Sequence, residues 1–113
     1  MKRGVEAEAM AAAFLEHKGL KILARNYRCR LGEIDLVARE GDTTVFVEVR
    51  SRRSSAFGGA AASITAAKRQ RLLKAARHYI SRQRALPQCR FDALLIEGAP
   101  PRIEWLRNAF GDS

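Results

Sequence analysis

The sequence predicts an α/β fold with the element order helix, strand, strand, strand, helix, strand, strand. Three observations predict it. A stretch rich in Ala, Glu and Leu, residues 4–18, precedes Gly19, a typical residue just past a helix end. Two segments, 33–39 and 44–50, alternate apolar and polar residues with the period of a strand. Apolar residues then recur at helical spacing after residue 70, and a strand-like apolar run follows them.

The remaining elements are delimited by caps, turn residues and prolines. We expect a strand at about 20–29, a loop at 51–63, a helix capped by Ser63 or Thr65 that continues to about Arg84, and strands at 89–97 and 102–106. No internal repeat or linker divides the chain. The 113 residues therefore predict a single domain, 1–113.

Composition excludes several classes of protein. Hydrophobic residues make up 47% of the chain and charged residues 29%, values typical of a globular domain rather than a disordered one. The apolar runs are too short to span a membrane, and no apolar segment follows the basic N-terminus as in a signal peptide. We therefore expect a cytoplasmic protein outside the membrane, with Cys29 and Cys89 as free thiols.

Positive charge is concentrated in one stretch of the chain. The sequence holds 21 Lys and Arg against 12 Asp and Glu, for a net charge of +9. From residue 50 to residue 90 there are 11 basic residues and no acidic one. A polyanion, most simply a nucleic acid, is the partner that this stretch predicts. An anionic membrane surface and a merely soluble basic face are the alternatives.

The two alternating segments predict a hairpin with a defined register. Gly41-Asp42 suits a two-residue turn of type II′, so that Glu40 pairs with Thr43. Counting back from that turn places Asp35 opposite Glu48, and Glu33 opposite Arg50. Side chains of directly paired residues share a face, with Cβ atoms roughly 5 Å apart. A slip of one residue would separate them, so the prediction depends on the turn.

This arrangement predicts a metal site. Facing carboxylates repel each other, whereas Mg²⁺ or Mn²⁺ takes hard oxygen ligands and can activate water beside a phosphodiester. Asp35 and Glu48 are the candidate ligands, and Val49 can add its backbone carbonyl. Arg50 can bind the scissile phosphate but is a poor base, because it keeps its proton. The alternative for Arg50 is a surface ion pair with Glu33.

Glu8 is a further candidate catalytic residue. On a helical wheel it lies beside Ala12 and Leu15, on the side expected to meet the sheet. There it could support the metal or hold a water molecule. The alternative is an ordinary glutamate on the flank of a helix.

Candidate contacts to nucleic-acid phosphates lie in and after the 51–63 loop. Lys68 and Thr65 are at the start of the second helix, where backbone amides favour anions. The other basic candidates are Arg52, Arg53, Arg71 and Lys74. Phe57 in the loop could stack on a base. A solvated lysine is the alternative for Lys68.

Several of these residues together resemble the bacterial YraN-like family. The motifs are Gly32-Glu33-Ile34-Asp35, 45–50 with Glu48 and Arg50, Arg52-Arg53, 57–60, 63–65 with Lys68, 89–92, and 103–105 followed by 108–110. That family is similar to Holliday-junction resolvases and to the wider PD-(D/E)xK superfamily. The resemblance implies a restriction-endonuclease-like core, with a mixed central sheet flanked by helices.

The same resemblance implies roles for individual residues. Asp35 and Glu48 stand at the acidic positions of the motif, and Glu8 matches its helix glutamate. Lys68 matches a helix lysine of the YraN-like pattern. Arg50 departs from the pattern, because it occupies the position of the motif's lysine.

These inferences predict a Mg²⁺- or Mn²⁺-dependent endonuclease that acts on DNA, including branched or damaged DNA. A homodimer would supply the two sites that resolvase-like enzymes use. A non-catalytic nucleic-acid-binding module with a vestigial carboxylate site is the first alternative, and Arg50 favours it. An adaptor whose basic helix meets an acidic protein is the second.

Overall fold

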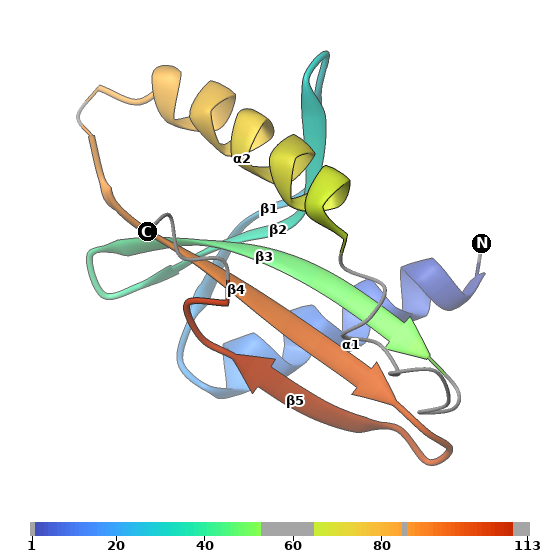
Figure 1. Ribbon diagram of the computed structural model, residues 1–113. Helices are drawn as coiled ribbons and strands as arrows, with labels where there is room; N and C mark the ends of the chain where they lie inside the picture. Colours follow the sequence, from blue (N-terminus) through green and yellow to red (C-terminus); the bar gives the residue numbers. More distant parts are fainter. Residues whose placement is uncertain (1, 53–64, 85, 110–113) are drawn as a thin grey trace.

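The computed structural model of the chain describes residues 2–52, 65–84 and 86–109, with the side chains of 2–5 and 52 left out. Its elements are α1 (Lys2–His17), β1 (Lys21–Cys29), β2 (Gly32–Glu40), β3 (Thr43–Arg52), α2 (Ala66–Ser81), β4 (Gln88–Glu97) and β5 (Arg102–Leu106) (Figure 1). The predicted α/β class and element order are confirmed. No helix in the described part of the chain has the length and apolar character needed to cross a membrane.

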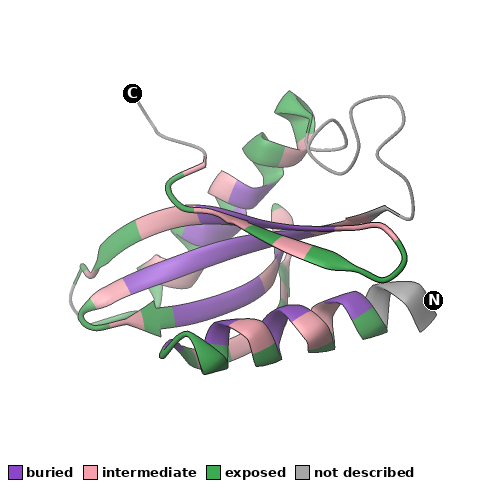
Figure 2. Cartoon of the chain, turned by 90° about the horizontal axis from the view of Figure 1, so that it is seen from below, coloured by how far each residue is buried: buried purple, intermediate pink, exposed green. Residues whose placement is uncertain are grey.

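One five-stranded sheet has the order β1-β2-β3-β4-β5, and it is mixed because only β3 and β4 run parallel. The helices lie on opposite sides of it, with their buried residues turned toward the strands (Figure 2). The apolar cluster on one face contains Ala11, Ala12 and Leu15 of α1. The cluster on the other face contains Leu72, Ala75 and Ala76 of α2. Helices on both faces explain why Val45, Phe46 and Val47 of β3 are all fully buried.

The predicted hairpin register is confirmed where β2 and β3 pair. Glu40 pairs with Thr43 and Leu36 with Val47, and Gly41 has the positive φ (+60°) that the first central residue of a type II′ turn requires. Pairing with β3 stops at Leu36. From Asp35 to Gly32, β2 pairs with β1 alone, so the β1–β2 hairpin leaves the sheet and projects beside α2 (Figure 1).

Two predicted boundaries are wrong. Ser51 and Arg52 belong to β3 rather than to a loop, because their pairing with β4 extends the parallel ladder to Glu97. The second helix ends at Ser81 rather than Arg84. Its end tightens into a turn, in which the N–H groups of Arg82 and Gln83 donate to carbonyls three residues back, at 3.2 and 2.9 Å.

The start of α2 agrees with one of the two predicted caps. The hydroxyl of Thr65 accepts a hydrogen bond from the N–H of Lys68 at 3.2 Å, which satisfies one free donor of the first turn. Ser63, the other candidate, lies outside the described residues, as do Arg53 and Phe57.

Candidate metal and phosphate site

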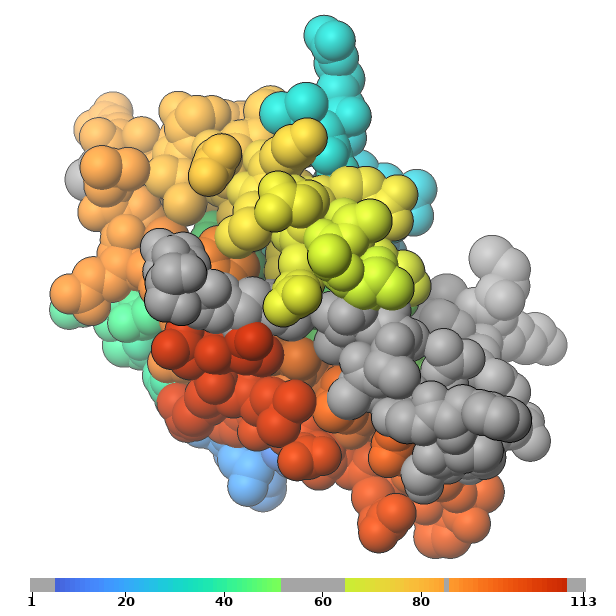
Figure 3. Space-filling model, viewed as in Figure 1, coloured from blue at the N-terminus to red at the C-terminus, as the bar shows by residue number. Residues whose placement is uncertain are grey.

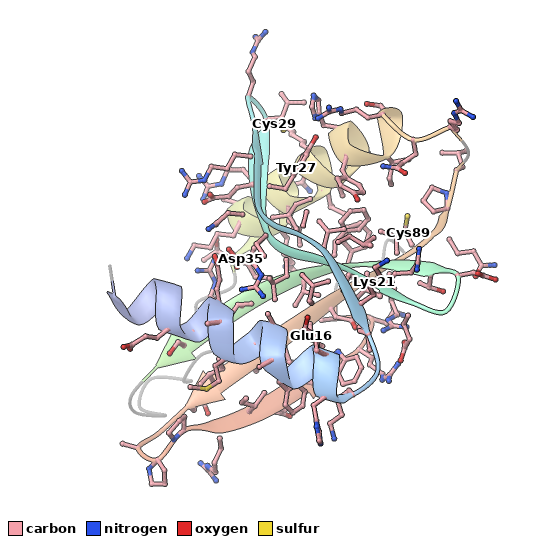
Figure 4. All side chains as sticks on the ribbon, turned by 180° about the vertical axis from the view of Figure 1, so that it is seen from behind. Glu16, Lys21, Tyr27, Cys29, Asp35 and Cys89 are labelled. Carbon is pink, nitrogen blue, oxygen red and sulfur yellow. The ribbon has the colours of Figure 1, made fainter. Side chains whose placement is uncertain are left out.

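Asp35 lies at the point where β2 separates from β3. Because the ladder ends at Leu36, its side chain can reach the backbone of the next strand, and its Oδ2 accepts a hydrogen bond from Val49 N–H at 2.8 Å. Figure 4 shows Asp35 at the foot of the hairpin that carries Tyr27 and Cys29. Burial raises the pKa of Asp35, and the Val49 bond and the charge of Arg50 oppose that rise. The carboxylate is thus fixed at an interruption in strand pairing.

Glu48 of β3 faces Asp35 with only 7% of its surface exposed. Burial and, next, the nearby charge of Asp35 raise its pKa to about 8, against the opposing charges of Arg50 and Lys68. Asp35 and Glu48 form what we call the Asp35–Glu48 pair: Asp35 raises the pKa of Glu48, whereas the side-chain bond to Glu48 lowers the pKa of Asp35. The β2–β3 ladder ends one pair before these residues, and their two side chains nevertheless lie together in one cavity, as the Gly41-Asp42 turn predicted.

Arg50 forms its ion pair with Glu48, the residue two positions before it on the same face of β3. The alternative ion pair between Arg50 and Glu33 is wrong: Glu33 bonds instead to Arg28 at 3.4 Å, on the exposed hairpin. Glu33 lies beyond the end of the β2–β3 ladder, and β1 is its partner strand there. Arg50 Nε is buried and finds no hydrogen-bond partner among the described residues.

Glu8 approaches this region from α1. Burial raises its pKa, and the next largest cause is the charge of Asp35, so the two carboxylates lie within electrostatic reach of each other. Asn26 of β1 donates through Nδ2 to Glu8 Oε1 at 3.1 Å. Sequence reasoning missed Asn26, although its type was a signal: it adopts a positive φ of 51°, which asparagine tolerates better than most residues.

A small cavity of about 60 Å³ joins the predicted residues from three elements. Its lining consists of Glu33, Asp35, Glu48, Arg50, Lys68 and Arg71. Lys68 and Arg71 of α2 therefore lie at the carboxylates, as a phosphate-binding role requires. Lys74 is exposed one turn farther along α2 and lines no part of this cavity.

The donor set fits a hard divalent cation bound partly by the protein. Among the described residues no cluster of three or more His, Cys, Asp or Glu side chains forms a complete metal cage. Mg²⁺ commonly uses one or two carboxylates and completes its shell with water and phosphate oxygens. The Asp35–Glu48 pair offers that set, and burial raises the pKa of both carboxyl groups, so a bound cation would favour their charged forms. The predicted ligation by the Val49 carbonyl remains a prediction.

A second group of buried charges, which sequence reasoning also missed, lies on the neighbouring strand. Asp92 of β4 is 0% exposed and accepts bonds from Arg90 Nε and Nη2, Trp105 Nε1 and the Asn108 N–H, each at 2.9 Å. Arg90 also bonds to Glu40 at 2.9 Å. The signal was an aspartate inside an otherwise apolar run, which must find donors when buried. We call these residues and Arg107, which binds Glu40, the Asp92 network.

Comparison with known proteins yields a consistent set of relatives. The profile of the uncharacterised protein family UPF0102 matches residues 7–96. A UPF0102 protein of Nitrosomonas europaea is 59% identical over 112 residues, which cover 98% of this chain and 95% of the relative. Family members from Methylobacillus flagellatus and Cupriavidus taiwanensis are each 55% identical, over 95% and 96% of this chain and 95% and 82% of their own lengths.

Proposed function

Because the chain belongs to the uncharacterised protein family UPF0102, whose name assigns no reaction, we propose a function from its own site: a divalent-metal-dependent endonuclease that hydrolyses DNA phosphodiesters. The single observation that carries this proposal is the Asp35–Glu48 pair, held in a cavity beside Lys68 and Arg71. The two facing carboxyl groups can bind a cation, and the basic side chains beside them can bind a phosphate.

The acidic residues would hold the metal and its water. Asp35 and Glu48 are the proposed ligands, and a bound Mg²⁺ or Mn²⁺ would activate a water molecule and neutralise charge that develops on the phosphate. The Val49 N–H already fixes the orientation of Asp35, so the ligand is positioned before the metal binds. Glu8, held by Asn26, is a positioning residue at the edge of the site.

The basic residues would hold the DNA backbone. Arg50 is bonded to Glu48, and a cation at Glu48 would weaken that ion pair and release the guanidinium for the scissile phosphate. Lys68 and Arg71 would bind the same or the adjoining phosphate from the α2 side. Because arginine keeps its proton, we assign Arg50 to phosphate binding rather than to removal of a proton from water.

The test is a cleavage assay on labelled duplex, single-stranded and four-way-junction DNA with Mg²⁺, Mn²⁺ or EDTA. We expect metal-dependent cleavage that falls about a thousandfold or more in Asp35→Asn and in Glu48→Gln. Glu16→Gln, an exposed carboxylate on α1, is the matched control and should cleave as wild type does. Cleavage that survives in EDTA, or that persists in both site variants, would overturn the proposal.

One observation favours a second candidate function, a non-catalytic DNA-binding module. The ion pair between Arg50 and Glu48 neutralises part of the charge that would attract a metal. In that case the purified protein would bind DNA with strong salt dependence. Mg²⁺ would not change its affinity for DNA, and the DNA would stay uncleaved. The same cleavage assay, run beside a binding titration, separates the two functions.

Two consequences follow for location and assembly. A DNA substrate would be consistent with a location in the cytoplasm. Cutting both strands of a duplex requires two sites, which a homodimer would supply. Native mass measurement with and without DNA tests the dimer, and single-strand nicking by a monomer would exclude it.

A further inference from the structure

We propose that the tip of the β1–β2 hairpin is a DNA-contacting wedge, which inserts Leu31 into the minor groove of a duplex held at the neighbouring cavity. The inference rests on the proposed DNA partner but not on catalysis. The tip is a two-residue turn, Arg30-Leu31, closed by pairing of Cys29 with Gly32. It stands out beyond the rest of the surface in Figures 1 and 3.

The side chains at the tip combine apolar surface with positive charge. Leu31 is 52% exposed, and among the large hydrophobic residues in the described part of the chain only Leu86 is more exposed. Arg30 is exposed beside it, and the side chain of Arg28 is 72% exposed. Proteins that bind the minor groove place arginine in the negative potential of the groove and insert an apolar side chain between base steps. The tip carries both groups on adjacent residues.

The hairpin is held rigidly, as a wedge must be. Gly32 packs directly on α2: a Cβ at this position would lie 2.2 Å from the carbonyl oxygen of Arg71. Farther down the hairpin the Tyr27 hydroxyl lies 2.5 Å from His78 Nδ1, and the Tyr27 ring meets Tyr79 edge-on with centroids 5.2 Å apart. These contacts fix the tip relative to α2 before any partner binds, which lowers the entropy cost of insertion.

A recess connects the tip with the candidate site. Its volume is about 300 Å³, and it is lined by residues 28–33 of the hairpin together with Arg71 of α2. Glu33 and Arg71 also line the cavity that contains Asp35 and Glu48. A DNA backbone bound at that cavity would therefore continue past Arg71 toward the tip. This shared lining favours DNA over an unrelated partner for the exposed leucine.

The test measures binding and bending in EDTA, so that cleavage plays no part. Wild type, Leu31→Ser and Leu86→Ser are titrated against a duplex and a single strand of equal length, and bending is followed by energy transfer between dyes at the duplex ends. Leu86 is 86% exposed beyond the other end of α2 and is the matched control. We expect Leu31→Ser to weaken duplex binding about fivefold and to reduce the bend, with single-strand binding unchanged.

Charge provides a second, independent readout. Leu31→Ser should leave the slope of log affinity against log salt unchanged, whereas Arg30→Ala should reduce it by about one. The inference is overturned if Leu31→Ser binds and bends the duplex as wild type does, or if wild type binds no duplex. If Leu31 is needed for binding to anionic vesicles and not to DNA, its partner is a membrane surface. If Leu31→Ser loses self-association instead, its partner is a second copy of the chain. If Leu31-dependent bending occurs without metal-dependent cleavage in the earlier assay, the nuclease proposal fails and the wedge stands.

Discussion

Glu48 of β3 and Asp92 of β4 are both buried carboxylates, and they lie one residue apart in register on neighbouring parallel strands. Asp92 receives four hydrogen bonds from its own chain, two of them from Arg90. Glu48 meets another carboxyl group, Asp35, and a single guanidinium, that of Arg50. Nearly equal burial thus has opposite electrostatic consequences in the two regions.

The difference identifies which carboxylate is available to a ligand. A buried charge that is fully hydrogen-bonded stabilises the arrangement around it and has no capacity left for a metal. A buried charge that faces a like charge destabilises the free protein and gains most when a cation arrives. On this basis the Asp92 network is structural, and the Asp35–Glu48 pair is the candidate for binding.

The largest expected difference between the Asp92 network and the Asp35–Glu48 pair is in the free energy of unfolding of their variants. Asp92→Asn should lower the free energy of unfolding by about 3 kcal/mol, because it removes the fully buried charge that accepts from Arg90, Trp105 and Asn108. Glu48→Gln replaces a carboxyl group whose charge is disfavoured by burial and by Asp35, and should be at least as stable as wild type. Urea denaturation of both variants measures the two values. Equal destabilisation by both substitutions would contradict the distinction between the regions.

Metal should stabilise the protein through one region only. With Mg²⁺ or Mn²⁺ at about ten times its dissociation constant, the free energy of unfolding should rise by about 1.4 kcal/mol. The increment should vanish in Asp35→Asn and persist in Asp92→Asn, although the latter protein is less stable overall. Thermal unfolding with and without metal provides the measurement. An increment that Asp35→Asn retains would place the cation elsewhere.

The two regions should also make stability depend on pH in opposite directions, with one contribution lost as the pH rises and the other lost in acid. The pKa of Glu48 is raised from 4.5 to about 8, so its neutral form contributes stability that is complete below about pH 4.5 and is lost as the pH rises toward 8. The pKa of Glu40 is lowered by its bonds to Arg107 and Arg90, so its contribution is present above pH 4.5 and is lost in acid.

Melting temperatures between pH 3 and 9 in EDTA test both signs. Glu48→Gln should flatten the decline of a few degrees between pH 5 and 8, and Glu40→Gln should weaken the loss in acid alone. A profile of Glu48→Gln that matches wild type would mean that Glu48 is charged throughout this range.

The smallest effect concerns exposed charge on α2. Lys74→Ala should weaken DNA binding about threefold and reduce the salt slope by about one, because Lys74 is exposed on the helix that faces the site. Arg102→Ala, an exposed residue on β5 at the far edge of the sheet, is the control and should change neither. If both variants behave alike, binding follows net charge rather than the basic face of α2.

The candidate site could be predicted because it depends on local geometry. The turn at Gly41 sets the register of the β2–β3 ladder, and the residues just beyond its last pair, Asp35 and Glu48, line one cavity. The partner of Arg50 could not be predicted, because it depends on where β2 leaves β3, which no local pattern marks. The Asp92 network was likewise out of reach: beside the local donor Arg90, Trp105 of β5 and Asn108 after it meet Asp92 only once the sheet is assembled.

The contact of Gly32 with α2 has a consequence for how this protein can change during evolution. A side chain at Gly32 would collide with backbone, so substitution there is constrained by the fold itself. The two turn residues before it, Arg30 and Leu31, are exposed and can be exchanged at little cost to stability. Selection can therefore vary the chemistry of the tip while its position relative to Asp35 is inherited unchanged. A lineage could acquire a new target preference through this turn without rebuilding the site that the hairpin supports.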